Sequence, residues 1–340
     1  MSDDYKTNAR TLMQGYCRVC PICNGRACIG EVPGMGGLGT AASFHNNISA
    51  LQAVTLNMTA LHSVTAPNTA TTFLGTKLTF PVLAAPIGGA QFNMSKGFSE
   101  EDYIEAVLAG FEAEGSLGCT GDGVPPFIID AAVASLAKHK GIPFIKPWEG
   151  KELYEKIDRV LETNPPAIGM DVDAAGLVTL RKMGRPVTPM DPGTLKDVIG
   201  YAHERKTPFI VKGIMTPLDA EKAIQSGADA IVVSNHGGRI LDHCPGTAQV
   251  LPAIAKIVRH RIPIAVDGGV RTGTDVLKML ALGADVVLIG RPVSVASVGG
   301  GLQAVQSYCQ TIKAQLTQAM LLTGVATIAD ITEDILYAKA

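Results

Sequence analysis

The feature that most constrains the fold is a repeated alternation of short apolar runs and longer amphipathic runs between residues 78 and 290. The apolar runs have the length and β-branched content of buried strands, and helical spacing of apolar residues marks the longer runs. Strands are predicted at residues 80–86, 118–121, 143–148, 167–171, 208–213, 230–234, 262–267 and 285–290. Helices are predicted at residues 100–114, 150–162, 193–205, 217–226, 247–259 and 273–282.

Strands that alternate with helices form a parallel sheet, because each crossover places a helix on a face of the sheet. Eight such units predict a closed (β/α)8 barrel, the TIM barrel, within α/β proteins. Residues 1–70 are predicted as a cysteine-rich and helical segment that packs on the barrel. Residues 71–340 are predicted as the barrel, with C-terminal helices from about residue 296, so that the whole chain forms one domain.

The charge and hydropathy of the chain exclude several classes of partner. The net charge is −2 and no basic block occurs, so neither nucleic acid nor an anionic membrane is expected to bind. No apolar run is long enough to span a bilayer. The N-terminal residues carry acids with no apolar stretch behind them, so we expect no signal peptide and a cytoplasmic location.

Four of the seven cysteines fall within the segment from Cys17 through Cys20 and Cys23 to Cys28. This C-x2-C-x2-C-x4-C spacing lets the thiolates converge on one ion or cluster, and both zinc and an iron–sulfur cluster are chemically compatible with it. Reduced thiols in a loop, or cysteines that pair only on oxidation, are the alternatives. The glycine-rich residues 34–39 lack a preceding strand and a Gly-Lys-Ser/Thr sequence, so a connector is predicted there instead of a phosphate loop.

Polar residues stand at the ends of almost all predicted strands, where barrel enzymes place their chemistry. A single aspartate at such a place often caps a helix, and a single lysine often reaches solvent. Their occurrence at so many consecutive strand ends indicates an active site. The strand ends carry residues 86–90, Thr120, Lys146 with Trp148, Asp171, Lys212, His236 with Arg239, residues 267–271, and Gly290 with Arg291.

Three of these strand ends suggest specific chemistry. His236 can take a proton near neutral pH and Arg239 can bind a carboxylate, so the pair suits proton abstraction beside a carboxylate. Backbone amides of Gly268 and Gly269, with the guanidinium groups of Arg271 and Arg291, follow the seventh and eighth strands. This fold commonly holds a phosphate there, so a phosphorylated cofactor is predicted.

The most specific motifs lie at residues 211–214, 234–239, 267–276 and 283–292. With them the chain, over residues 43–325, resembles the FMN-dependent α-hydroxy-acid oxidases and dehydrogenases, such as glycolate oxidase, lactate oxidase and the flavocytochrome lactate dehydrogenases. The resemblance implies a catalytic set of four residues. His236 would be the base, Asp171 would pair with its imidazolium, Arg239 would bind the substrate carboxylate, and Lys212 would stabilise reduced flavin.

The resemblance also implies an FMN site. The backbone of Ile87 and Gly88 would face the reactive nitrogen N5 of the flavin, and Ser234 would touch the ring. The residues implied in FMN binding are Pro86, Ile87, Gly88, Thr120, Lys146, Lys212, Ser234, Asp267, Gly268, Gly269, Arg271, Gly290 and Arg291.

The substrate side departs from the family pattern. Trp148 stands where the family has a tyrosine that hydrogen-bonds substrate, and its indole can only donate. Val178 stands where a second substrate arginine is expected, seven residues after Asp171, and Arg181 or Arg185 could compensate. The expected substrate contacts are therefore Trp148 together with the base and the carboxylate-binding arginine named above.

The expected function is oxidation of an (S)-2-hydroxy acid, lactate-like, to the 2-oxo acid, with flavin N5 as hydride acceptor. The alternatives are a related FMN enzyme acting on an amine, a peptide end or an isoprenoid-like compound, and a cysteine-based redox or metal-binding protein on a barrel scaffold. Oxygen, a quinone and a redox protein are all possible electron acceptors. The family resemblance implies a homo-oligomer, commonly a tetramer.

Overall fold

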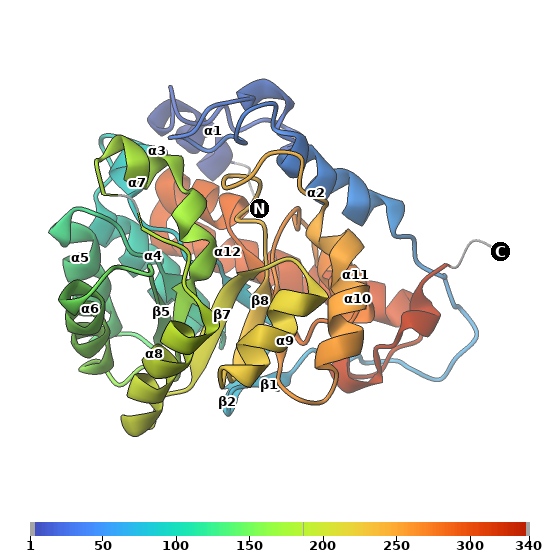
Figure 1. Ribbon diagram of the computed structural model, residues 1–340. Coiled ribbons are helices and arrows are strands. Elements are labelled where there is room, and N and C mark those ends of the chain that lie inside the picture. Colours follow the sequence, from blue (N-terminus) through green and yellow to red (C-terminus); the bar gives the residue numbers. More distant parts are fainter. Residues whose placement is uncertain (1–3, 186, 338–340) are drawn as a thin grey trace.

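The computed structural model describes residues 4–185 and 187–337, and its centre is a ring of eight parallel strands (Figure 1). The strands are β3 (Val82–Ala84), β4 (Gly118–Thr120), β5 (Gly141–Ile145), β6 (Ile168–Asp171), β7 (Phe209–Ile214), β8 (Ala230–Val233), β9 (Ile264–Val266) and β10 (Val286–Ile289). Their hydrogen-bonded order is β3-β10-β9-β8-β7-β6-β5-β4. Each predicted strand overlaps one of these elements.

The first and last strands in this order, β3 and β4, meet across the remaining gap. The amide of Ala84 donates a hydrogen bond to the carbonyl of Leu117 over 3.2 Å, and a parallel bridge joins Ile87 to Thr120. The ring is thus nearly closed, which confirms the predicted (β/α)8 barrel.

The interior of the barrel is filled by apolar side chains from alternate strand positions, among them Leu83, Phe144 and Val232. An antiparallel hairpin closes one end of it. The hairpin consists of β1 (Thr71–Phe73) and β2 (Thr76–Leu78), and its buried side chains Phe73 and Leu78 belong to the same apolar cluster. This hairpin was not predicted from the sequence, because two strands of three residues give almost no periodicity.

Helices surround the ring, as the alternation predicts. They are α4 (Glu100–Ala113), α5 (Pro126–Leu136), α6 (Lys151–Leu161), α8 (Pro192–Glu204), α9 (Pro217–Gln225), α10 (Thr247–Val258) and α11 (Gly273–Ala281). Side chains of Ser99, Thr216 and Thr272 cap three of these helices by accepting hydrogen bonds from the first turn. Helix α5 was not predicted individually, because its apolar residues are not confined to one face.

Shorter elements lie at the opposite end from the hairpin, around the carboxyl ends of the strands. They are α3 (Ala90–Asn93), a 3-10 segment (Val172–Gly176) and α7 (Val178–Lys182). Further 3-10 turns occur at Arg26–Cys28, Ile328–Asp330 and Glu333–Ile335.

The N-terminal and C-terminal segments pack together outside the ring. Helix α12 (Arg291–Leu322) is interrupted at Gly300 and Gly301, and α1 (Asp4–Leu12) packs on it. The Asn8 side chain donates to the carbonyl of Gly299 over 2.7 Å, and a Cβ at Gly299 would lie 2.1 Å from the carbonyl oxygen of Tyr5. Only glycine allows this approach of the two helices.

Helix α2 (Ala42–Ala53) contacts α10 and α11, and α1 and α2 lie at the top of the view in Figure 1, opposite the hairpin. Across the described part of the chain, no helix has the length and hydropathy required to cross a bilayer, including the 32-residue α12.

Candidate active site

A cavity lies at the carboxyl ends of the barrel strands, where the sequence placed the chemistry. Most of the predicted site residues line it. They are Pro86, Ile87, Gly88, Lys146, Asp171, Lys212, His236, Arg239, Asp267, Gly268, Gly269, Arg271, Gly290 and Arg291. Thr120 and Ser234 are buried and do not line the cavity, so any influence they have on a ligand passes through neighbouring residues.

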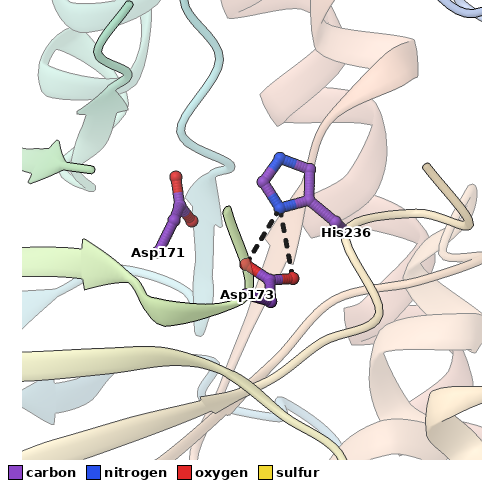
Figure 2. A group of neighbouring side chains, drawn as sticks. All are labelled: Asp171, Asp173 and His236. Atoms are coloured by element: carbon purple, nitrogen blue, oxygen red, sulfur yellow. Dashed lines mark hydrogen bonds and ion pairs between the residues drawn. The ribbon is translucent and has the colours of Figure 1, made fainter. Parts of the chain in front are cut away.

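His236 is held in one orientation by its own loop and by a carboxylate (Figure 2). The residue follows β8 with a positive φ of 56°, and its amide donates to Ser234 Oγ over 3.0 Å. Its Nδ1 lies 3.2 and 3.3 Å from the two carboxylate oxygens of Asp173. When Nδ1 carries the proton and donates it to Asp173, Nε2 is unprotonated and can accept a proton from a ligand.

The expected partner of His236 was Asp171, and the structure gives the hydrogen bond to Asp173 instead. The side chain of Asp171, separate from this bond in Figure 2, forms an ion pair with Lys212 over 2.9 Å and lies 3.8 Å from Lys146 Nζ. Asp171 still contributes negative charge to the histidine, since the ligand atoms of Asp171, Asp173 and His236 all lie within 4.8 Å of one another.

The floor of the cavity is therefore a buried network of opposite charges. Burial alone would raise the pKa of Asp171, but the charges of Lys212, His236 and Lys146 hold this pKa below its usual value. Burial alone would lower the pKa of Lys212, and the charges of Asp171, Asp173 and Asp267 raise it above its usual value instead. Lys212 is thus a permanent cation at neutral pH, although only 2% of its surface is exposed.

Arg239 places a guanidinium in the cavity wall without a carboxylate partner. It donates from Nη1 to the carbonyl of Gly34 and from Nη2 to Asn93 Oδ1 over 2.9 Å. Burial, together with the charge of Arg291, lowers the pKa of Arg239 to about 9, which still leaves it charged at pH 7. Among residues 4–185 and 187–337 no acidic side chain forms an ion pair with it, so the site favours an anionic ligand.

A second basic region of the same cavity has the features of a phosphate site. Gly268 and Gly269 adopt positive φ angles of 99° and 83°, and a Cβ at Gly269 would lie 2.6 Å from the carbonyl oxygen of Asn47. Arg271 and Arg291 also line this region, and α12 begins at Arg291, so the N-terminus of this helix lies at the cavity. Arg271 Nε is buried and has no hydrogen-bond partner.

Asp267 joins these two regions. Its Oδ2 accepts a hydrogen bond from Ser234 Oγ over 2.8 Å, while its Oδ1 is buried and has no partner. Burial raises the pKa of Asp267, and the charge of Lys212 opposes this effect. A free acceptor at Asp267 and a free donor at Arg271 suit a ligand that carries both hydroxyl and phosphate groups. The residues present therefore fit FMN, whose ribityl chain ends in a phosphate.

The strand end at residues 86–89 presents backbone to the cavity. A Cβ at Gly121 would lie 2.3 Å from the amide nitrogen of Gly88, so the close packing of these two turns excludes a side chain at Gly121. The buried carboxylate of Glu100 accepts hydrogen bonds from the amides of Gly89 at 2.9 Å and Ala90 at 2.6 Å. Glu100 thereby fixes this turn, and burial raises the pKa of its carboxyl group.

Trp148, which was expected to contact substrate, lies outside the residues that line the cavity. Its indole is 4% exposed, does not line the cavity, and donates from Nε1 to Asp122 Oδ2 over 2.5 Å. Asp122 also forms a 2.7 Å ion pair with Lys156, whose Nζ lies 4.3 Å from the centre of the indole. Trp148 thus belongs to a buried structural network beside the site, because a carboxylate from the neighbouring strand end takes its only donor.

The two arginines that could have replaced the missing second substrate arginine do not reach the cavity. Arg181 is exposed and donates to the carbonyl of Ala175 over 3.3 Å, and Arg185 pairs with Glu152. Counted from Asp173, the actual partner of the histidine, the seventh residue is Leu180, which lines the cavity. An apolar residue therefore occupies the position of the expected second substrate arginine.

The four clustered cysteines are free and half-buried, and they face a second cavity. It adjoins the first, because Met35, Gly269, Arg271 and Arg291 line both. In the described residues, the one group of three or more potential metal ligands within 4.8 Å of one another is Asp171, Asp173 and His236. No three of the four cysteine sulfur atoms lie as close to one another as the atoms of that group.

Three residues that shape the site were not predicted from the sequence: Asp173, Asn93 and Glu100. A signal existed for Asp173, since the sequence Asp171-Val-Asp173 offers two carboxylates at the same strand end. Nothing in the sequence marks Asn93, which supports Arg239 from 146 residues away, or distinguishes Glu100 from other acids in the first turn of a helix.

Comparisons with known proteins agree with this geometry. The family model described as FMN-dependent dehydrogenase matches residues 34–108 and 181–338. An L-lactate oxidase of Lacticaseibacillus rhamnosus is 33% identical over 320 residues, which cover 86% of this chain and 85% of that protein. A 2-hydroxyacid oxidase of Dictyostelium discoideum is 50% identical over 151 residues, and the match spans 39% of its length.

The fold has solved counterparts. A candidate lactate oxidase of Pediococcus acidilactici superposes with a TM-score of 0.79 at 28% identity, over 99% of this chain and 94% of that one. The family match includes His236, Arg239 and Lys212, whereas the segment with Asp171 and Asp173 and the cysteine segment lie outside it. The family model thus matches the basic and glycine-rich part of the site, and it does not match the part that residues 109–180 contribute.

Proposed function

Because the chain belongs to the family of FMN-dependent dehydrogenases, we propose that it oxidises an (S)-2-hydroxy acid to the corresponding 2-oxo acid. The observation that carries this proposal is the guanidinium of Arg239, a cation without an acidic partner in the wall of a cavity. It lies in the same loop as His236, whose Nδ1 is bonded to Asp173. One group can hold a carboxylate while the other takes a proton from the adjacent carbon or its hydroxyl.

The reaction removes two electrons and two protons from the substrate's CH–OH group. Arg239 binds the substrate carboxylate through paired N–H donors, which fixes the hydroxyl-bearing carbon beside the imidazole. Nε2 of His236 takes one proton, and Asp173 stabilises the imidazolium that forms. FMN, when bound, supplies the acceptor for the remaining proton and two electrons as a hydride equivalent.

The residues that would hold FMN are those that line the basic part of the cavity. Gly268, Gly269, Arg271 and Arg291 would hold the phosphate, and Asp267 Oδ1 would accept a hydrogen bond from a ribityl hydroxyl. Lys212 would place a permanent positive charge at the floor of the cavity, where negative charge on a bound cofactor is stabilised.

The substrate that these residues favour has an apolar side chain. Leu177, Leu180 and Met183 from the segment after β6, with Phe92 and Ile128, line the cavity. They offer no second cation for a dicarboxylate, and an uncompensated charge among them would be costly. A lactate-like hydroxy acid meets these conditions, which agrees with the relatives described as 2-hydroxyacid oxidase and L-lactate oxidase.

The test is an absorbance spectrum of the FMN-loaded protein in the absence of air, before and after L-lactate, with D-lactate as the control. We expect the oxidised flavin bands to bleach with L-lactate only. The variant His236→Ala should bind FMN and stay oxidised. Flavin that no 2-hydroxy acid reduces, across short and longer apolar side chains, would overturn the proposed reaction while leaving the cofactor assignment intact.

Assembly into a homo-oligomer, of four copies by family resemblance, is also proposed. Light scattering coupled to size-exclusion chromatography measures the mass directly. A monomer of 35.5 kDa at micromolar concentration would contradict this part of the proposal.

A further inference from the structure

The cysteine segment forms one wall of a cavity of about 670 Å³ beside the candidate active site. The opposite wall comes from the start of α12, from its middle near Tyr308, and from the turn before α11. All four cysteines of the segment, Cys17, Cys20, Cys23 and Cys28, line this cavity. Residues far apart in the sequence thus enclose a space that all four cysteines line.

The local backbone arranges the thiols around this space. Val19 and Gly25 adopt positive φ angles of 45° and 85°, which turn the chain sharply between successive cysteines. The amide of Val19 donates to Cys17 Sγ over 3.4 Å, a contact that is common for sulfur atoms that act as metal ligands.

The cavity also carries positive charge that the rest of the protein does not neutralise. Arg271 Nη2 lies 3.5 Å from Cys23 Sγ, and Arg291 lines the same wall. Neither guanidinium forms an ion pair with an acidic residue in the described chain; Arg291 donates instead to the carbonyls of Met35, Gly36 and Gly237. A group ligated by four thiolates is anionic, so these cations would stabilise it.

The spacing of the sulfur atoms favours a cluster over a single ion. Zinc binds thiolates at about 2.3 Å, which places tetrahedral sulfur ligands about 3.8 Å from one another. No three of these sulfur atoms lie within 4.8 Å of one another. In an iron–sulfur cluster the thiolates bind different iron atoms, so the four sulfur atoms stand further apart and enclose a larger volume.

We propose that Cys17, Cys20, Cys23 and Cys28 ligate an iron–sulfur cluster in this cavity. The cluster lies next to the residues that would hold the FMN phosphate, because Gly269, Arg271 and Arg291 line both cavities. The three-cysteine run C-x2-C-x2-C is the spacing that bacterial ferredoxins use for three ligands of one cluster. In their run the fourth cysteine follows after three residues and ligates the other cluster, whereas Cys28 follows after four residues and lines the same cavity as the first three.

The experiment purifies the full-length protein without air and measures iron, acid-labile sulfide and zinc per chain, together with an electron paramagnetic resonance spectrum after dithionite. We expect iron and sulfide in equal amounts, at two or more of each per chain, and a signal from the reduced cluster. Zinc in place of iron, or no metal after anaerobic reconstitution with ferrous iron and sulfide, would overturn the proposal.

The variants Cys20→Ser and Cys23→Ser should lose most of the iron and the signal. Cys244→Ser is the matched control, since Cys244 is also a half-buried free thiol but lies outside the cavity; it should retain both. Equal iron in the control and in the two variants would overturn the ligand assignment. If a variant does not fold, the metal content of the wild-type protein still decides the question, and bleaching of flavin by L-lactate is scored separately.

Discussion

The pairing of His236 with Asp173 makes a prediction that separates this aspartate from its neighbour Asp171. Asp173→Asn keeps the size of the side chain and removes its charge. Two unit charges 3.2 Å apart interact by about 5 kcal/mol at an effective dielectric constant of about 20. If about half of the positive charge has developed on the imidazole in the transition state, the loss is about 2.5 kcal/mol, which lowers kcat/KM about 70-fold.

The assay is anaerobic flavin reduction by L-lactate in a stopped-flow instrument, with the flavin content of each variant determined beforehand. Asp173→Asn should bind FMN normally and be reduced slowly. Asp171→Asn should instead lose FMN or stability, because it leaves the buried Lys212 without its 2.9 Å partner. A less than threefold effect of Asp173→Asn at full flavin content would refute the role assigned to this carboxylate.

Three further predictions concern the carboxylate-binding Arg239, the buried carboxylate of Asp122, and the stability of the protein in acid. Arg239→Met should raise KM for L-lactate about 10- to 150-fold, because it removes a charge-assisted hydrogen bond of about 1.5–3 kcal/mol. An unchanged KM would contradict the role of Arg239 in binding the carboxylate. The control is Arg181→Met, since Arg181 is exposed. Asp122→Asn should lower the free energy of unfolding by about 3–5 kcal/mol in denaturant titrations, because it removes the 2.7 Å partner of the buried Lys156, whose other carboxylate contact, Glu152, lies 3.9 Å away; a loss below about 1 kcal/mol would contradict this. Burial alone would raise the pKa of the Asp242 carboxyl group, but hydrogen bonds from Thr40 lower this pKa to about 2. Because this folded-state pKa lies below the unfolded value, the stabilisation is present above about pH 4 and is lost as pH falls towards 2. Asp242→Asn should therefore cost about 1–2 kcal/mol at pH 7, after allowance for solvent screening, and little at pH 2; an equal cost at both values would contradict the linkage.

The sequence predicted the barrel because its signal is repeated eight times. Each buried strand is a short apolar run between helices, so an error in one unit does not change the fold class. The positions of Lys212, His236 and Arg239 followed from the same rule, since a barrel collects the carboxyl ends of its strands at one mouth.

The partners of individual side chains could not be predicted in the same way. After Asp171 the chain leaves the extended conformation and enters a 3-10 turn at Val172–Gly176, so strand alternation no longer tells which carboxylate points at His236. Trp148 turns away from the cavity because Asp122, 26 residues earlier on the neighbouring strand end, accepts its indole proton. Such pairings depend on the relative rotation of neighbouring strands, which residue patterns do not contain.

The contact between α1 and α12 also bears on how the protein is assembled. The hydrogen bond from Asn8 to Gly299 closes a loop of 291 residues, which spans most of the chain. Contacts of such high sequence separation form late, because the entropy of closing the loop is lost before the contact contributes. During synthesis the first helix leaves the ribosome long before its docking surface on α12 exists. Residues 4–28 are therefore expected to join the folded barrel last, and the cysteine segment to stay open to the surrounding solution until then.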